Sequence, residues 1–205
     1  MTINAYKNRS FYSESEFCQL CGTKHSEDAD CPPFEENADC STFKDERADY
    51  ITKLRLNLPL ELFEHNQFVC FRLIPASPKQ KKPPYNPNTG ELASINKPET
   101  WGTFEEAAKM YLEHPEYAGL GFVFTADDPY TRIDLDNCID PETGEVTDWA
   151  EKIINYLESF TEISVSQTGV HILLKGKKPG PHCKAGSIEI YSSERYFTMT
   201  GSLLP

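Results

Sequence analysis

The chain has 205 residues, of which 39% are hydrophobic and 25% are charged, and it carries a formal net charge of −12 at pH 7. This length suits one domain of ordinary size, with or without a small appendage, and the composition permits a packed core. No apolar run approaches the length of a membrane span, and the first residues lack the apolar centre of a secretory signal, so we expect a cytoplasmic protein with no membrane partner.

The negative charge is unevenly distributed along the chain. Residues 68–98 hold one acid and five bases, residues 99–169 hold 16 acids and three bases, and residues 170–205 hold two acids and five bases. Two basic segments therefore flank an acidic middle. Such runs are usually solvated surface, but they also suit a cation site edged by anion-binding patches, so the net charge does not exclude nucleic acid as a partner.

The first part of the chain differs from the rest. Residues 1–64 are acidic and poor in apolar residues, and we expect them to form an appendage to a compact domain at 65–205. The appendage contains four of the seven cysteines, which are Cys18, Cys21, Cys31 and Cys40. A disulfide framework is not expected in a cytoplasmic protein. The CxxC pair is a half-site for structural Zn²⁺ that four thiolates could complete, and the alternative is an acidic tail with unremarkable thiols.

Hydrophobic periodicity and turn signals define the elements that follow. Helical spacing predicts helices at 47–58, 102–114 and 147–160. Short apolar or alternating runs predict strands at 68–74, 118–125, 131–136, 161–166, 170–176, 187–191 and 195–201. The Pro- and Lys-rich stretch at 75–91 is expected to be a loop. Many strands with few helices favour an α/β fold of the α+β kind, with a mixed, largely antiparallel sheet and flanking helices.

Two of the helices carry further signals. Thr103 with Glu106 forms a capping box at the start of one helix, and Pro115 ends it. In the last helix four residues recur at helical spacing, and we expect them in the core rather than in a binding stripe: Trp149, Ile153, Tyr156 and Leu157.

Polar side chains interrupt three of the expected strands. Asp134 and Asp136 lie two residues apart, so a strand places both carboxylates on one face, where each raises the pKa of the other. His171 opens an apolar run, and Glu189 stands between two isoleucines. Each of these residues alone is compatible with a solvent-facing or a hydrogen-bonded structural role.

Together the same residues indicate metal-assisted phosphoryl chemistry. Two or three carboxylates that converge on one sheet face suit Mg²⁺ or Mn²⁺. Two such ions about 3.5–4 Å apart would hold the attacking and leaving oxygens of a phosphoryl displacement. The segment 164–171 offers small hydroxyls, a glycine turn and an imidazole to a triphosphate. Further candidates for holding the anion are Arg195, Lys79, Lys81 and Lys82.

The order of these motifs resembles the primase-polymerase domains of phages and mobile elements, which belong to the archaeo-eukaryotic primase superfamily. The resemblance covers about residues 67–205 and rests on Asp134-Leu-Asp136, on the Ser-to-His element that ends at His171, and on the strand acid Glu189. The segment "KKPPYNPNTGELAS", followed by Trp101, matches the beginning of the family's domain. An archaeo-eukaryotic primase-like catalytic core is therefore expected.

The resemblance implies template-directed nucleotidyl transfer by a DNA primase or DNA polymerase. Asp134, Asp136 and Glu189 would ligate Mg²⁺ or Mn²⁺. The residues that would hold the triphosphate of the incoming nucleotide are Ser166, Thr168, Gly169 and His171, with Arg195 and Lys82 assisting. The implied partners are a single-stranded DNA template, a primer and ribo- or deoxyribonucleoside triphosphates, and a replicative helicase is a further candidate partner.

Two loops depart from the family pattern. Ser164, Val165, Ser166 and Gln167 stand where the family commonly has Ser-Pro-Ser-Gly, and Glu194 stands where a glycine often precedes the arginine. Gln167 removes a flexible position, and Glu194 adds negative charge beside the expected phosphates. A non-catalytic module that binds nucleotide or single-stranded DNA on the same fold is therefore the alternative function, and a zinc-containing regulatory protein is a third.

Overall fold

The computed structural model describes residues 40–77, 80–178 and 180–204, with side chains from Glu46 onward. Three of the predicted zinc ligands, Cys18, Cys21 and Cys31, therefore lie outside the described residues, as do the side chain of Cys40 and the residue Lys79. The chain divides into two compact units, Met1–Phe43 and Lys44–Pro205, and the described side chains all lie in the second unit.

The described elements are helices and short strands in alternation. The helices are α1 (Cys40–Asn57), η1 (Leu60–Glu64), η2 (Pro98–Thr100), α2 (Phe104–Glu113) and α3 (Asp148–Leu157). The strands are β1 (Phe68–Phe71), β2 (Pro84–Tyr85), β3 (Gly119–Phe124), β4 (Tyr130–Leu135), β5 (Phe160–Ile163), β6 (Val170–Lys175), β7 (Lys184–Ala185), β8 (Ile188–Tyr191) and β9 (Arg195–Thr198). No helix among the described residues is both long and apolar enough to cross a membrane.

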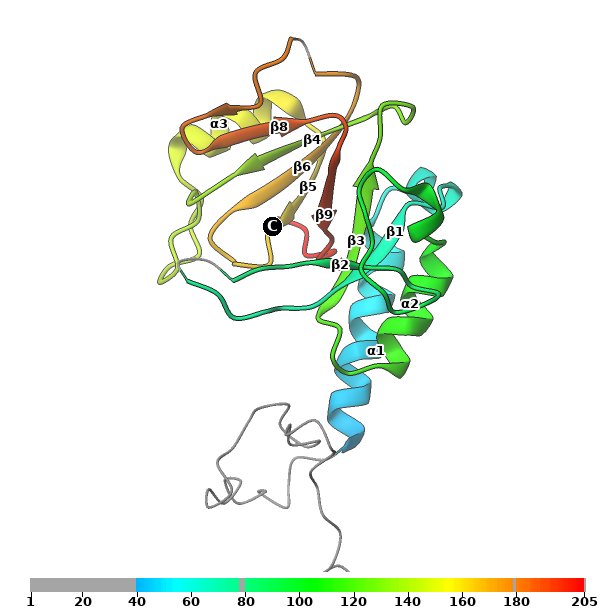
Figure 1. Cartoon of the computed structure of the whole chain (residues 1–205). Coiled ribbons are helices and arrows are strands. Elements are labelled where there is room, and N and C mark those ends of the chain that lie inside the picture. Colours follow the sequence, from blue (N-terminus) through cyan, green and yellow to red (C-terminus); the bar gives the residue numbers. More distant parts are fainter. Residues whose placement is uncertain (1–39, 78–79, 179, 205) are drawn as a thin grey trace, which may run out of the picture. The chain divides into compact units, whose positions relative to one another are not determined.

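The strands form two antiparallel sheets (Figure 1). The first sheet has the order β2-β1-β3-β9, and the second has the order β5-β6-β4-β8-β7. The expected α+β fold is confirmed, although the strands form two sheets where one was expected. The turn between β3 and β4 explains the division, since the buried Asp128 carboxylate accepts hydrogen bonds from the backbone of Thr125 at 2.6 Å and of Tyr130 at 2.9 Å. This turn directs β4 away from β3 and into the second sheet.

Two large apolar clusters pack against the sheets, and the first of them also takes in Tyr130 and Leu173 from the second sheet. Helices α1 and α2 pack on the first sheet with a cluster that includes Leu54, Phe104 and Phe122. The second sheet buries Ile133, Leu135 and neighbouring residues against α3. The predicted capping box of α2 is confirmed, since the Thr103 hydroxyl and the Glu106 carboxylate each accept the other residue's backbone N–H.

The compact unit begins earlier in the chain than the boundary expected near residue 65. Ile51, Leu54 and Leu62 are buried in the core of the first sheet, so the helical part of the expected appendage packs as part of the domain. The reason is local, because the apolar residues of α1 recur at helical spacing and need a partner surface.

One expected core residue of α3 is exposed. Trp149, Ile153 and Leu157 pack against the second sheet, but the exposed fraction of Tyr156 is 86%. The buried face of the helix centres on Ala150, which is fully buried. Tyr156 lies about 120° around the helix from Ala150, so its ring faces solvent.

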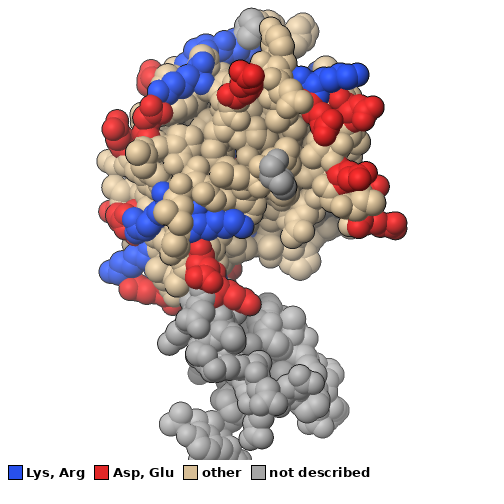
Figure 2. Space-filling view, turned by 180° about the vertical axis from the view of Figure 1, so that it is seen from behind, with Lys and Arg blue, Asp and Glu red and all other residues tan. Residues whose placement is uncertain are grey.

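The acidic and basic segments of the sequence do not form separate charged patches on the face of the molecule seen in Figure 2. Figure 2 shows the face seen from behind, where Lys and Arg side chains are interspersed with Asp and Glu around the margin and the centre is largely uncharged. The acidic middle of the sequence thus forms no single acidic surface on this face.

Candidate active site

The expected functional residues lie in one row across the second sheet. In the strand register, Asp134 on β4 is opposite His171 on β6 and opposite Glu189 on β8. The row extends at both ends, because Glu162 on β5 is opposite His171 and Lys184 on β7 is opposite Glu189. Residues directly opposite each other project from the same face of a sheet. Five strands therefore bring three acids, an imidazole and an amine to one face.

This polar row faces the first sheet rather than α3. Ile133 and Leu135 alternate with Asp134 and are buried against α3, so Asp134 projects from the opposite face. On that side the His171 ring lies 6.2 Å from the ring of Phe197 on β9. The candidate site is thus next to the strand that closes the first sheet.

Asp134 has an unfavourable environment for its negative charge. Burial raises the pKa of its carboxyl to about 6, and the carboxylates of Asp136 and Glu189 add to that rise, while Arg132 and Lys82 oppose it. Repulsion between Asp134 and Asp136 was expected from their spacing. The protein itself supplies two cations that compensate only in part.

Asp136 follows directly after the end of β4. Its backbone N–H donates to the Ser187 carbonyl at 2.8 Å, so the β4–β8 pairing continues to this residue. On the other side of β4, Gly169 approaches so closely that a Cβ there would lie 2.5 Å from the Leu135 carbonyl oxygen. Gly169, which was predicted to bind nucleotide, therefore has to lack a Cβ because the chain just before β6 lies against the end of β4.

Glu189 is held in place by two donors. Lys184 forms an ion pair with one carboxylate oxygen, and the Tyr191 hydroxyl donates to the other at 2.9 Å. The hydrogen bond from Lys184 lowers the pKa of Glu189, and that from Tyr191 and the charge of Arg195 lower it further. Glu189 is therefore a fixed anion beside Asp134.

The donor set has the chemistry of a Mg²⁺ or Mn²⁺ site, but the protein part of the shell is incomplete. Asp134, Asp136 and Glu189 offer hard carboxylate oxygens. Among the residues that the structure describes, no three His, Cys, Asp or Glu side chains are already gathered so as to hold a metal ion. Mg²⁺ commonly takes one or two carboxylates together with substrate phosphates, so these residues fit an ion that shares its shell with a nucleotide.

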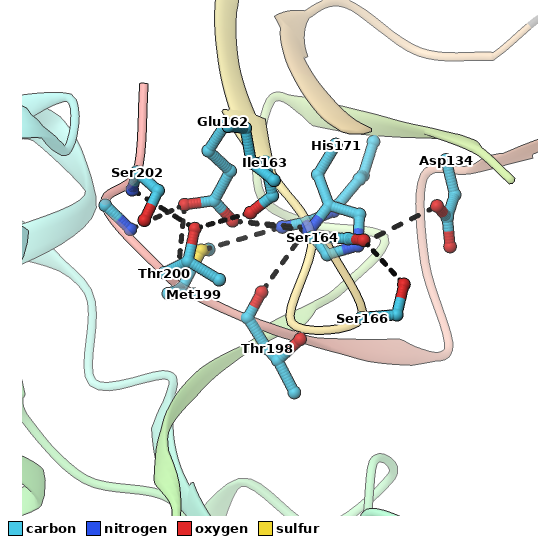
Figure 3. A network of polar contacts seen from close by, with 12 residues as sticks. Asp134, Glu162, Ile163, Ser164, Ser166, His171, Thr198, Met199, Thr200 and Ser202 are labelled. Atoms are coloured by element: carbon cyan, nitrogen blue, oxygen red, sulfur yellow. Dashed lines mark hydrogen bonds and ion pairs between the residues drawn. The ribbon is translucent and has the colours of Figure 1, made fainter. Parts of the chain in front are cut away.

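A chain of hydroxyl groups lies beside the row. The Ser164 and Ser166 hydroxyls are 3.0 Å apart, and the Ser166 and Thr168 hydroxyls are also 3.0 Å apart. Figure 3 shows Ser164 and Ser166 next to His171 on the side of Asp134. The structure thus brings the predicted triphosphate-binding hydroxyls to the predicted carboxylates.

Both loops that depart from the family pattern have a backbone suited to glycine. Gln167 has φ +62° and Glu194 has φ +54°, which lie in the left-handed region. At each position the backbone therefore has a conformation that glycine adopts more easily than any other residue does.

The two predicted cations lie near the carboxylates. Lys82 lowers the pKa of Asp134, and Arg195 lowers that of Glu189. The Arg195 guanidinium lies 4.6 Å from the centre of the Tyr191 ring, at the start of β9. Lys81 instead pairs with Ile74 through the backbone, in a bridge at the edge of the long loop.

Two residues of the site were missed in the sequence. Arg132 and Glu162 form an ion pair of 3.3 Å whose side chains are 1% and 0% exposed. The sequence contained a signal for both residues. Arg132 stands two residues before Asp134, so the two side chains share a face of the strand. Glu162 stands in the strand that pairs with β6, directly opposite His171. Strand alternation alone does not say that such charges are buried.

The fold and the site define the class of protein: an α+β domain whose acids and hydroxyls suit a metal-bound polyphosphate. No family model matches the chain. It is similar to a curated protein, the DNA primase-polymerase of the Nitratiruptor phage NrS-1, with 37% identity in an alignment 131 residues long that covers 61% of this chain. The predicted resemblance to phage primase-polymerases is therefore confirmed. The match covers 18% of the phage protein, so the chain spans less than a fifth of that relative's length.

Proposed function

We propose that this domain catalyses template-directed nucleotidyl transfer, as a DNA primase-polymerase that serves replication of a phage or mobile element. The observation that carries the proposal is the register that sets Asp134 between His171 and Glu189, with Asp136 at the end of the same strand. The similarity to the phage primase-polymerase supports it.

In this proposal the residues of the site divide into two groups. Asp134, Asp136 and Glu189 would ligate Mg²⁺ or Mn²⁺, which when bound neutralises charge on the reacting phosphates and activates the attacking hydroxyl. The triphosphate would be held by His171 on β6, by Arg195 at the start of β9, and by groups on the adjoining loops, which are Ser166, Thr168, Gly169 and Lys82. Catalysis would come from positioning and electrostatic stabilisation, since phosphoryl transfer needs no covalent intermediate.

The partners follow from the reaction. The domain would bind a single-stranded DNA template, a primer 3′-hydroxyl or a first nucleotide, and a nucleoside triphosphate. A replicative helicase is a candidate partner in the same process.

The test is an extension assay on a single-stranded template, with Mg²⁺ or Mn²⁺, with ribo- or deoxyribonucleotides, and with and without a primer. We expect metal-dependent incorporation that EDTA abolishes. No incorporation under any of these conditions by folded protein would overturn the proposal.

A specific observation favours a second candidate, a module that binds nucleotide or single-stranded DNA without catalysis. Glu189 is already paired with Lys184, and no three-ligand group is assembled among the described residues. If the protein binds nucleoside triphosphates but incorporates none in the extension assay, this second function replaces the first.

A further inference from the structure

Glu162 is the most enclosed charge of the site. Its side chain is fully buried on β5, at the inner end of the row. Four nitrogen atoms converge on its carboxylate. One oxygen faces Arg132 Nη2 at 3.3 Å and His171 Nδ1 at 3.4 Å. The other oxygen accepts the backbone N–H groups of Thr200 at 3.0 Å and Gly201 at 2.9 Å.

This arrangement requires a group that only accepts hydrogen bonds. A carboxylate accepts on both oxygens, whereas an amide accepts on one side and donates on the other. A Gln side chain at position 162 would turn its NH₂ group either toward Arg132 and His171 or toward the two backbone N–H groups. In either orientation a buried donor would face donors, which is costly.

The His171 ring lies between two carboxylates. Its Nδ1 faces Glu162 at 3.4 Å, and its Nε2 lies 3.7 Å from Asp134 Oδ1. Figure 3 shows Glu162 and Thr200 on one side of His171, and Asp134 and Ser166 on the other. Nδ1 therefore contacts the buried Glu162, and Nε2 is directed at the carboxylates and hydroxyls of the site.

A carboxylate that accepts one ring N–H fixes the tautomer and the plane of an imidazole, and thereby determines what the second nitrogen presents. Arg132 in turn holds Glu162, since its Nη2 also donates to the Thr198 carbonyl at 3.3 Å and its guanidinium lies 4.5 Å from the centre of the Phe197 ring. The pair thus ties β4, β5 and β9 together behind the imidazole.

We propose that Glu162 is a positioning residue, which accepts a hydrogen bond from the Nδ1–H of His171 and thereby fixes the ring with Nε2 directed toward the triphosphate of the nucleotide. Arg132 and the backbone of Thr200 and Gly201 fix the carboxylate that does this. Because Nδ1 keeps its proton, Nε2 donates to a phosphate oxygen only when it is protonated as well, so the ring that binds nucleotide is the imidazolium. The inference rests on the proposed function, because it assigns to Glu162 a part in nucleotide binding at the same site.

A double-mutant cycle on the whole chain tests the proposal. The variants are Glu162→Gln, His171→Ala and the pair, with Glu113→Gln as the control because Glu113 is exposed at the end of α2. The measured quantities are the dissociation constant of a nucleoside triphosphate with Mg²⁺, and KM and kcat for extension. We expect each single variant to weaken nucleotide binding about tenfold, with a larger effect on KM than on kcat, and the pair to be no weaker than His171→Ala alone. The control should bind as the wild type does.

Additive losses in the pair would overturn the proposal, because Glu162 would then act independently of His171. If Glu162→Gln fails to fold by circular dichroism, the cycle is run with Glu162→Asp, which keeps a carboxylate but shortens its reach. The same expectation and the same contradiction apply to that variant.

Nitrogen NMR of the imidazole provides a second readout that needs no nucleotide. The His171 signals are assigned by comparison with His171→Ala. We expect a protonated Nδ1 in the wild type and a smaller protonated fraction at Nδ1 in the Glu162 variant. An unprotonated Nδ1 in the wild type would overturn the inference whatever the protein catalyses. Absence of nucleotide binding in the wild type, with a protonated Nδ1, would instead count against the proposed function.

Discussion

The carboxyl of Asp134 lies among charges of both signs. Asp136 and Glu189 raise its pKa, and Arg132 and Lys82 lower it, after burial has already raised it. The sequence predicts the repulsion, because the spacing of the two aspartates is visible. It does not predict Arg132 as part of the compensation, because the burial of a strand arginine depends on β9, which lies more than sixty residues further along the chain. The negative charge that Arg132 and Lys82 leave uncompensated suits a divalent cation.

Replacing Asp134 with Asn should stabilise the metal-free protein. The folded-state pKa of about 6 exceeds the ordinary value of 3.8, so ionisation costs more in the folded state. This cost is absent below about pH 4 and complete above about pH 6, where it amounts to about 3 kcal/mol. Asp134→Asn should therefore raise the free energy of unfolding at about pH 8 and leave it nearly unchanged at about pH 4. Urea denaturation without divalent ions at both pH values measures the difference, and an equal effect at both would contradict it.

Gln167 should tolerate glycine better than a β-branched residue. Its φ of +62° is a conformation that costs a residue with a Cβ about 1 kcal/mol or more. Gln167→Gly removes this cost but loses part of the gain to chain entropy, so the free energy of unfolding should change by no more than about 0.5 kcal/mol. Gln167→Val should lower it by more than about 1 kcal/mol. Thermal unfolding of the two variants side by side decides the matter, and a Val variant as stable as the Gly variant would refute this reasoning.

At the scale of elements, short-range sequence signals predicted the features that depend only on neighbouring residues. The capping box of α2 and the strands around the three motifs are where periodicity and turn residues place them. Strands β2 and β7 have two residues each, which is too few to show the alternation of a strand. The division into two sheets depends on which strands pair, and β9 pairs with β3 across a long stretch of chain. No short-range pattern encodes that choice.

Helix α1 should contribute to the stability of the domain. Leu54 is fully buried in the core of the first sheet, whereas the exposed fraction of Leu56 on the same helix is 78%. Leu54→Ala should lower the free energy of unfolding by about 2–5 kcal/mol, because it removes buried methyl groups and leaves a cavity. Leu56→Ala is the matched control and should change it by less than about 0.5 kcal/mol. Similar urea midpoints for the two variants would mean that α1 does not pack on the domain.

At the scale of the whole molecule, the two sheets meet where the polar row of one faces β9 of the other. The residues that carry the motifs come from β4, β6 and β8, and the other anion-binding candidates come from the adjoining loops and from the start of β9. The sequence predicted which residues gather, because the motif order resembles that of a known family. It did not predict Glu162 and Arg132, because their burial is a consequence of the whole fold.

Metal and nucleotide should stabilise the molecule together. In the proposed site the carboxylates would provide only part of a metal shell, and phosphate oxygens would complete it. A thermal-shift measurement with Mg²⁺ and a nucleoside triphosphate should therefore show a larger rise in Tm than the sum of the rises with either alone. Strictly additive rises would contradict shared coordination.

The most direct test of nucleotidyl transfer at the Asp134–Asp136 pair is primer extension by the variant Asp134→Ala/Asp136→Ala. Its control is Asp127→Ala/Glu142→Ala, which removes two exposed acids from turns. With both proteins folded by circular dichroism, we expect the first variant to lose extension by at least about a thousandfold, since charge stabilisation in phosphoryl transfer is worth that much. The control should extend primers at the wild-type rate. Full activity in the Asp134→Ala/Asp136→Ala variant would contradict the assignment of this site.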